Sequence, residues 1–221
     1  MKPTRIALLL LLGLGGALAQ AQDANLLVSH VLVSVGADGL KRTTEFSERV
    51  YRRENMVWVE RVIPQGAHTA EEHRSGGPEH KHLDVAAAAR WISRDERGNP
   101  QLKLVSSEDK AIVSVASADY GNVGFDGSWA SAYHLSDPAV LKKMTPGPRT
   151  SQGRWYSQAG NGGQMRLLWN DRLQLPMQIE SQDVRGLSRK VTRVQAIPAP
   201  RTLPWTGLNG YATKDYSDFL D

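Results

Sequence analysis

The stretch Leu173-Gln174-Leu175-Pro176-Met177-Gln178-Ile179-Glu180 alternates apolar and polar residues without interruption. A period of two is typical of a β-strand that has one buried side and one solvent-facing side. Pro176 lies on the polar side of this alternation, and its nitrogen cannot donate a ladder hydrogen bond. The stretch therefore predicts a strand that lies at a sheet edge or carries a bulge at Pro176.

Similar short extended segments, separated by turn signals, recur from residue 26 to residue 197. The first two are joined by Gly36-Ala37-Asp38-Gly39, whose Asp-Gly pair suits a tight hairpin. The pattern predicts about nine strands. The predicted strands are Leu26–Val35, Thr43–Arg53, Met56–Ile63, Trp91–Asp95, Gln101–Val105, Ala111–Ser117, Gln164–Trp169, Leu173–Ser181 and Leu187–Ile197.

Helix signals are few. Asp137 and Pro138 suit the N-cap and first position of a helix that stops before Pro146. Asp84 suits the cap of a second short helix over residues 86–89, although these residues also suit a strand. Connections this short do not accommodate parallel βαβ units, so the predicted fold is mainly β (α+β). We expect a curved antiparallel sheet or half-barrel meander with one or two short helices.

The N-terminal segment has the layout of a secretory signal peptide. Lys2 and Arg5 precede an uncharged, Leu-rich run, and small residues follow it. The run is about 14 residues long, which is short for a membrane-spanning helix. We predict a signal peptide at 1–21, one β-rich domain at 22–197 and a Pro-rich linker with an acidic aromatic tail at 198–221. The expected location is the periplasm or the exterior, with no membrane span after cleavage.

Composition excludes several classes of function. The sequence contains no cysteine, which rules out disulfides, thiol nucleophiles and Cys-ligated zinc or iron–sulfur centres. Its formal charge of +4 becomes +2 when Lys2 and Arg5 are removed, which is too weak a charge to indicate a nucleic-acid partner. The Gly-rich segment at 121–129 lacks the Lys-Ser/Thr of a phosphate loop, and there is no GxSxG motif. We therefore expect a protein that is not an enzyme.

The later part of the chain resembles the LolA/LolB-type half-barrel proteins of the bacterial envelope. The resemblance rests on Trp155-Tyr156, Leu167-Leu168-Trp169 and the Leu-Pro-apolar-polar-Ile-Glu strand at 173–180, and it covers about half of the chain by pattern. The His-rich loop and the acidic aromatic tail have no counterpart in that pattern. The resemblance implies a concave apolar sheet face that holds an acyl chain or a partner's peptide without catalysis.

Aromatic residues in the predicted strands are candidates for such a face. Trp58, Trp91 and Trp169 are the predicted ligand-binding residues, since large aromatics in strands either pack a core or line an apolar pocket. The leading prediction is a non-enzymatic periplasmic binding or accessory protein for an apolar small molecule, a lipid or an envelope protein.

Four of the six histidines fall within the loop at 64–84. In an extended conformation His80, His82 and Asp84 would share one face, and His73 could add a ligand. No cofactor is certain, but Zn, Cu or Ni (or haem) would suit these ligands. The alternative function is therefore a periplasmic transition-metal binding protein, against which stands an exposed His-rich loop with no native ligand.

The C-terminal segment at 211–221 alternates aromatic and acidic residues. Tyr211, Tyr216 and Phe219 could anchor a partner protein, which would make the chain a structural subunit of an envelope complex. The same residues could instead fold back and cover apolar surface of the chain's own sheet. The sequence does not separate these two alternatives.

Overall fold

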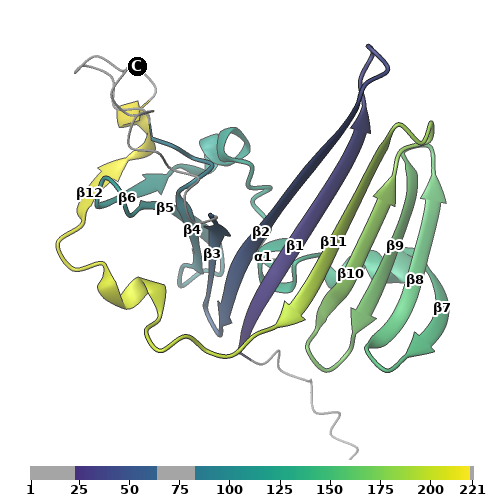
Figure 1. Cartoon of the computed structure of the whole chain (residues 1–221). Coiled ribbons are helices and arrows are strands. Elements are labelled where there is room, and N and C mark those ends of the chain that lie inside the picture. The colour runs from purple at the N-terminus through teal and green to yellow at the C-terminus, as the bar shows by residue number, and fades with distance from the viewer. Residues whose placement is uncertain (1–22, 64–82, 220–221) are drawn as a thin grey trace, which may run out of the picture.

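The computed structural model describes residues 23–63 and 83–219, and these residues form a single 12-stranded sheet. The strand order is β12-β6-β5-β4-β3-β2-β1-β11-β10-β9-β8-β7. Every neighbouring pair is antiparallel except β12 and β6, which are parallel. The sheet is strongly curved, and the β1–β2 hairpin lies near its middle (Figure 1).

The strands are β1 (Ala24–Val35), β2 (Lys41–Arg53), β3 (Met56–Val62), β4 (Ala89–Arg94), β5 (Pro100–Ser106), β6 (Ala111–Val115), β7 (Thr145–Thr150), β8 (Gly153–Gly160), β9 (Gly163–Asn170), β10 (Leu175–Gln182), β11 (Ser188–Ala196) and β12 (Ala212–Asp215). The helical elements described are α1 (Trp129–His134) and the 3-10 turns η2 (Ser117–Val123), η3 (Pro138–Lys143), η4 (Pro204–Gly207) and η5 (Tyr216–Phe219).

The mainly β, curved and open architecture agrees with the sequence prediction, but the predicted number of about nine strands is wrong. The missed strands are β7, β8 and β12. β7 contains Pro146 and Pro148, which normally argue against a strand; they are tolerated because β7 lies at the sheet edge, where unpaired positions need no N–H donor. β12 has only four residues, too few for a periodic pattern.

The bulge predicted at Pro176 is present, whereas the alternative of an edge position is wrong. β10 pairs with β9 on one side and β11 on the other, and the register shifts between Pro176 and Gln178. Pro176 is fully buried rather than on a wet side. The bulge removes the need for a ladder hydrogen bond at the proline nitrogen.

Both predicted cap residues accept hydrogen bonds from backbone N–H groups, but only Asp137 begins a helical element, and the helix predicted over residues 86–89 is absent. The Asp137 carboxylate accepts a hydrogen bond from the Ala139 N–H at 2.8 Å, and η3 ends well before Pro146. The Asp84 carboxylate accepts hydrogen bonds from the N–H groups of Ala86 and Ala87, but the segment makes only a turn before β4 begins. The α1 helix was not predicted, since its six residues show no repeated apolar spacing.

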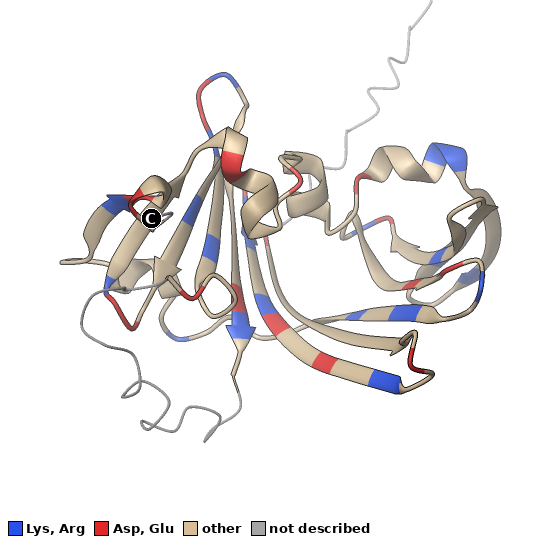
Figure 2. Ribbon diagram, turned by 90° about the horizontal axis from the view of Figure 1, so that it is seen from above, with Lys and Arg blue, Asp and Glu red and all other residues tan. Residues whose placement is uncertain are grey.

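The two faces of the sheet can be followed through the register, because directly paired antiparallel residues point to the same side. α1, η2, η3 and η5 lie on the concave side (Figure 2), and the largest core cluster lies under α1, η2 and η5. This cluster contains fully buried side chains of β3, β5 and β6, such as Val57, Leu104 and Val113.

The C-terminal segment wraps around the β12 edge of the sheet. Trp205, Leu208 and Tyr211 pack on the convex face over Tyr51 and Trp58. After β12 the chain turns to the concave side, where Tyr216 is 9% exposed and belongs to the main core. The half of the sheet made of β3–β6 is therefore covered on both faces.

Candidate ligand-binding face

The concave face of the other half of the sheet carries a lateral row of side chains in direct register. Pairings across β2, β1, β11, β10, β9 and β8 place these residues side by side on one face. Six strands at a spacing of about 4.8 Å make the row about 24 Å long. The concave row consists of Phe46, His30, Thr192, Ile179, Leu167 and Tyr156.

Three apolar members of the concave row, Phe46, Ile179 and Tyr156, are only partly buried. Leu32 and Met165, one step further along their strands on the same face, are also partly buried. Leu167 is fully buried, because residues of η3 and Met144 pack over it. Ile179, Tyr156 and Met165 pack against the same cluster, so the apolar side chains outside it are Phe46 and Leu32, at the β1–β2 end of the row.

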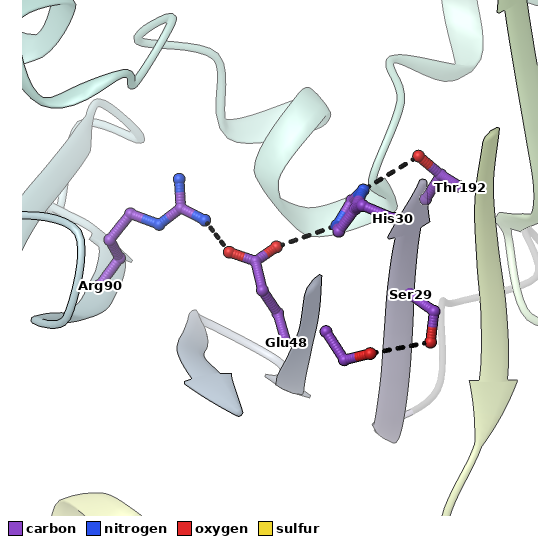
Figure 3. A network of polar contacts seen from close by, with 6 residues as sticks. Ser29, His30, Glu48, Arg90 and Thr192 are labelled. Atoms are coloured by element: carbon purple, nitrogen blue, oxygen red, sulfur yellow. Dashed lines mark hydrogen bonds and ion pairs between the residues drawn. The ribbon is translucent and has the colours of Figure 1, made fainter. Parts of the chain in front are cut away.

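A polar network stands at the β1–β2 end of the row (Figure 3). The Glu48 carboxylate accepts a hydrogen bond from Arg90 Nη2 at 2.8 Å and lies 3.2 Å from His30 Nε2. His30 Nδ1 lies 3.0 Å from the Thr192 hydroxyl. The side chains of His30 and Glu48 are 12% and 17% exposed, so the network is mostly shielded from water.

Phe46 lies between two cationic or polar groups from neighbouring strands. His30 of β1 stacks on its ring at a centroid distance of 4.6 Å. The guanidinium of Arg61, from β3, lies 3.8 Å from the centroid of the same ring. These contacts fix the orientation of Phe46 and hold positive charge at the edge of the apolar row.

The pKa of Glu48 is below its ordinary value. Burial raises this pKa, but the hydrogen bond with His30 and the charges of Arg90, His30 and Arg61 lower it by more. Glu48 is therefore a carboxylate at neutral pH and keeps Arg90 in place.

Hydrogen-bond contacts connect the Thr192 hydroxyl, the His30 imidazole and the Glu48 carboxylate in the order found in a catalytic triad. Thr192 lies in the middle of β11, is 7% exposed and is paired on both sides. Backbone N–H groups at such a position are used in the ladder, so they do not form the oxyanion hole that acyl transfer requires. The network orients Thr192, His30 and Glu48 relative to one another and to Arg90.

α1 is fixed across the concave side by two contacts to the β9–β10 turn. Arg52, which is 1% exposed, donates to the carbonyls of Leu173 at 2.8 Å and Tyr133 at 3.4 Å. His134 Nδ1 lies 2.6 Å from the carbonyl oxygen of Gln174 and acts as its donor. Burial lowers the pKa of His134, and this outweighs the hydrogen bond with Gln174, which raises it. These hydrogen bonds connect α1 with β2 and with the β9–β10 turn.

The three predicted ligand-binding tryptophans do not lie together. Trp58 and Trp91 contact each other on the convex face, with ring centroids 6.2 Å apart, and Trp205 covers Trp58. Trp169 lies on the concave face, is 2% exposed and packs with Leu167 and Met144. Trp58 and Trp91 on one face and Trp169 on the other cannot contact one small ligand together.

The predicted partner-binding aromatics contact this chain itself. Tyr211 packs on the convex face, and Tyr216 and Phe219 pack against the concave core. Of the two alternatives open from the sequence, folding back over the sheet is the one adopted. A partner that used these side chains would have to displace the segment.

The predicted metal ligands His73, His80 and His82 lie outside the described residues. Asp84 is described, and one of its oxygens is used by the turn that it caps. Within residues 23–63 and 83–219 no group of three or more potential ligands gathers to hold a metal ion. The metal site stays a prediction.

The residues of the polar network were missed by the sequence prediction, although β2 carries a usable signal. Phe46, Glu48, Val50 and Arg52 share one side of an alternating strand. Two charged residues on the side that also carries Phe46 and Val50 indicate paired or functional charges. Their partners Arg90 and His30 lie in other strands and are not recognisable from spacing.

No family model matches the chain, and no curated protein is significantly similar to it. Solved structures similar to it include a putative outer membrane lipoprotein-sorting protein domain from Vibrio parahaemolyticus, with 10% identity, a TM-score of 0.34 and coverage of 84% of this chain and 89% of that one. A LolA superfamily protein from Nitrosomonas europaea has 10% identity, a TM-score of 0.31 and coverage of 83% and 89%.

The Pseudomonas aeruginosa MucA/MucB complex is also similar, with 12% identity, a TM-score of 0.35 and coverage of 82% of this chain and 54% of that one. The Nitrosomonas europaea protein is a member of the superfamily that the later part of this sequence resembles. At these identities the likeness concerns the fold alone. Among the described residues, no helix is long and apolar enough to cross a membrane.

Proposed function

We propose that this chain is a non-enzymatic binding protein of the bacterial envelope that holds an elongated apolar ligand, such as an acyl chain, along the concave row. The observation that carries the proposal is the partial exposure of Phe46, Ile179 and Tyr156 on one concave face. Covering partly exposed apolar side chains with an apolar ligand removes them from water, and this lowers the free energy of the complex.

The geometry of the row suits an elongated ligand. Its members come from six neighbouring strands, so the ligand would cross the strands at about a right angle over a length of about 24 Å. Arg61 and Arg90 stand at the β2 end, where the polar end of an amphiphile would find donors. The proposed contact residues Phe46, Ile179 and Tyr156 differ from the three tryptophans predicted from the sequence. The proposal keeps the predicted mode of binding, in which an apolar ligand lies on a concave sheet face.

Native mass spectrometry of the protein, purified without a tag or chelator from the envelope of its own cells, tests this proposal. We expect an adduct of lipid mass in the unaltered protein and its loss in Phe46→Ser/Ile179→Ser. Val33→Ser is the matched control, because Val33 is also partly buried in β1 but points to the convex face.

Other outcomes of the same spectrum favour the alternative functions. An adduct of one metal ion that disappears in His80→Ala/His82→Ala would support metal binding instead. A protein partner retained by the Phe46→Ser/Ile179→Ser variant would support a structural subunit. A lipid adduct that is unaffected by Phe46→Ser/Ile179→Ser would contradict the concave site, whether or not it is lost in Val33→Ser.

A further inference from the structure

Exposed apolar side chains collect at one end of the sheet, outside the concave row. Among the described residues the exposed large hydrophobics are Leu40, Ile63, Val184 and Leu187. Leu40 and Val184 are 61% and 68% exposed, and with Leu187 they lie in the β1–β2 and β10–β11 turns. The two turns are neighbours, since the Val35 N–H donates to the Leu187 carbonyl at 2.8 Å.

These turns project at the end of the sheet, and the β1–β2 hairpin extends furthest (Figure 1). Single exposed hydrophobics are common on protein surfaces, but three at the tips of two adjacent turns are not explained by folding. Each tip is already stabilised by polar contacts. The Asp38 carboxylate accepts from the Leu40 N–H, and the Asp183 carboxylate accepts from the Ser188 N–H.

Basic residues surround these apolar tips. Residues 36–42 and 183–190 contain five basic side chains against two acidic ones, Asp38 and Asp183. Asp38 is paired with Arg42, and Arg189 Nη2 lies 3.8 Å from the Glu180 carboxylate, so the positive charge of this surface comes mainly from Lys41, Arg185 and Lys190. The basic residues are Lys41, Arg42, Arg185, Arg189 and Lys190, and all are exposed.

Three turns at the opposite end of the sheet differ in carrying no exposed large hydrophobic side chain. Residues 54–55, 95–99 and 171–174 contain four acidic side chains and two basic ones, and no exposed large hydrophobic. The acidic residues are Glu54, Asp95, Glu96 and Asp171, and the basic ones are Arg97 and Arg172. Among the turns compared, the exposed large hydrophobics thus lie at one end of the sheet only.

We propose that the turns at 36–42 and 183–190 form a tip patch that docks this protein on an anionic phospholipid surface. Separate protruding apolar side chains can enter the headgroup region of a bilayer, while the surrounding Lys and Arg side chains attract its negative charge. A flat protein partner would leave such protruding tips poorly packed. This inference uses residues distinct from the concave row and goes beyond ligand binding.

Vesicle co-sedimentation at low salt tests the tip patch. We expect the purified protein to bind phosphatidylglycerol/phosphatidylethanolamine vesicles, to leave phosphatidylcholine vesicles unbound, and to dissociate as salt is added. Lys41→Glu/Arg185→Glu should weaken binding at least tenfold, and Leu40→Ser/Val184→Ser severalfold. The matched control Arg97→Glu/Arg172→Glu removes the same charge at the opposite end and should bind as the unaltered protein does.

A fluorescent label reports which end touches the bilayer. Because the sequence has no cysteine, Ala37→Cys and Glu96→Cys each give one labelling site, at the tip patch and at the opposite end. An environment-sensitive dye should shift to the blue on anionic vesicles at position 37 only. The proposal is overturned by absence of binding to anionic vesicles, by equal losses in the tip and control variants, or by a shift at position 96 alone.

Protease-treated envelope membranes distinguish a lipid from a protein partner. Binding that survives the treatment and depends on Lys41 and Arg185 supports docking on lipid. Binding that the treatment abolishes shows that the tip patch recognises a membrane protein, and this overturns the proposal.

Discussion

The two halves of the sheet consist of similar strands but differ in how far other segments of the chain cover their faces. In the half made of β3–β6, the C-terminal segment covers the convex face, and α1, η2 and η5 pack on the concave face. In the half made of β1, β2 and β8–β11, the cluster formed with η3 buries Leu167 and packs against Ile179 and Tyr156, whereas Phe46 lies outside it. One half is therefore a closed core, whereas the other keeps partly exposed apolar side chains on its concave face.

The difference explains why aromatic residues alone were a poor guide to the site. Trp58 lies in the closed half and is 3% exposed, because Trp205 packs on it. Phe46 lies in the open half and is only partly buried. The coverage of a face by distant segments, and not the residue type, decides whether an aromatic side chain is available.

The largest expected effect comes from breaking the connection between the halves. Arg52→Met removes two donors to the carbonyls of Tyr133 and Leu173 from a site with almost no access for water. We expect the free energy of unfolding to fall by about 3 kcal/mol. Urea denaturation measures this, with exposed Arg97→Met as the control; a loss as small as that of the control would show that α1 is not held by Arg52.

The next largest effect concerns the closed half. Trp205→Ala uncovers Trp58 and Tyr51 and should lower the free energy of unfolding by about 2 kcal/mol. Trp155→Ala, on the convex face of the open half, should cost less, because Trp155 is only partly buried and the guanidinium of Arg166 lies over its ring. Thermal denaturation of the two variants and of the unaltered protein measures the difference in stability. Equal stability of the Trp205 variant and the unaltered protein would indicate that the C-terminal segment is a binding element and not part of the core.

A smaller effect is expected at the polar network of the open half. Glu48→Gln should lower the free energy of unfolding by about 1–2 kcal/mol at neutral pH, because Arg90 and His30 lose a charged acceptor. The folded-state pKa of Glu48 is lowered, so its contribution is complete above the unfolded-state pKa of about 4.3 and is lost as the pH falls through the lower folded-state value.

The free energies of unfolding of the unaltered protein and of Glu48→Gln should therefore converge as the pH becomes acidic. Urea titrations of both proteins from neutral to acidic pH check this expectation. A difference that stays constant with pH would mean that the charge of Glu48 does not contribute.

The smallest effect involves His134 at the end of α1. Its pKa is lowered by burial, so the folded protein favours the neutral ring. As the pH falls below the unfolded-state pKa of about 6.5, the unfolded chain binds the proton first and stability declines by about 1 kcal/mol or less. His134→Asn keeps a donor near Gln174 but does not titrate. Its stability should change less between about pH 7.5 and about pH 5; an identical decline would assign the pH dependence to other groups.

The fold was largely predictable because local patterns determine it. The alternation of 173–180 and the Asp-Gly turn at 38–39 both predicted elements that form, and the pairing of Asp137 with Pro138 marked the start of η3. β7 was missed because its two prolines are acceptable only at an edge, and strand order is not a local property.

The site was predictable only in part, for a related physical reason. Which residues share a face of one strand can be read from a period of two, as for Phe46 and Glu48. Which strands lie beside each other depends on pairing between β1 and β11, whose partners Thr192 and His30 are 162 residues apart. No spacing in the sequence predicts that contact.

The most direct test of the account is a fluorescence titration with a dansyl-labelled long-chain fatty acid. The unaltered protein and Val33→Ser should bind the probe equally, and Phe46→Ser/Ile179→Ser should bind it at least tenfold more weakly, because two apolar contacts of the concave row are lost. Equal binding by all three proteins, or weaker binding by Val33→Ser alone, would contradict a ligand site on the concave face.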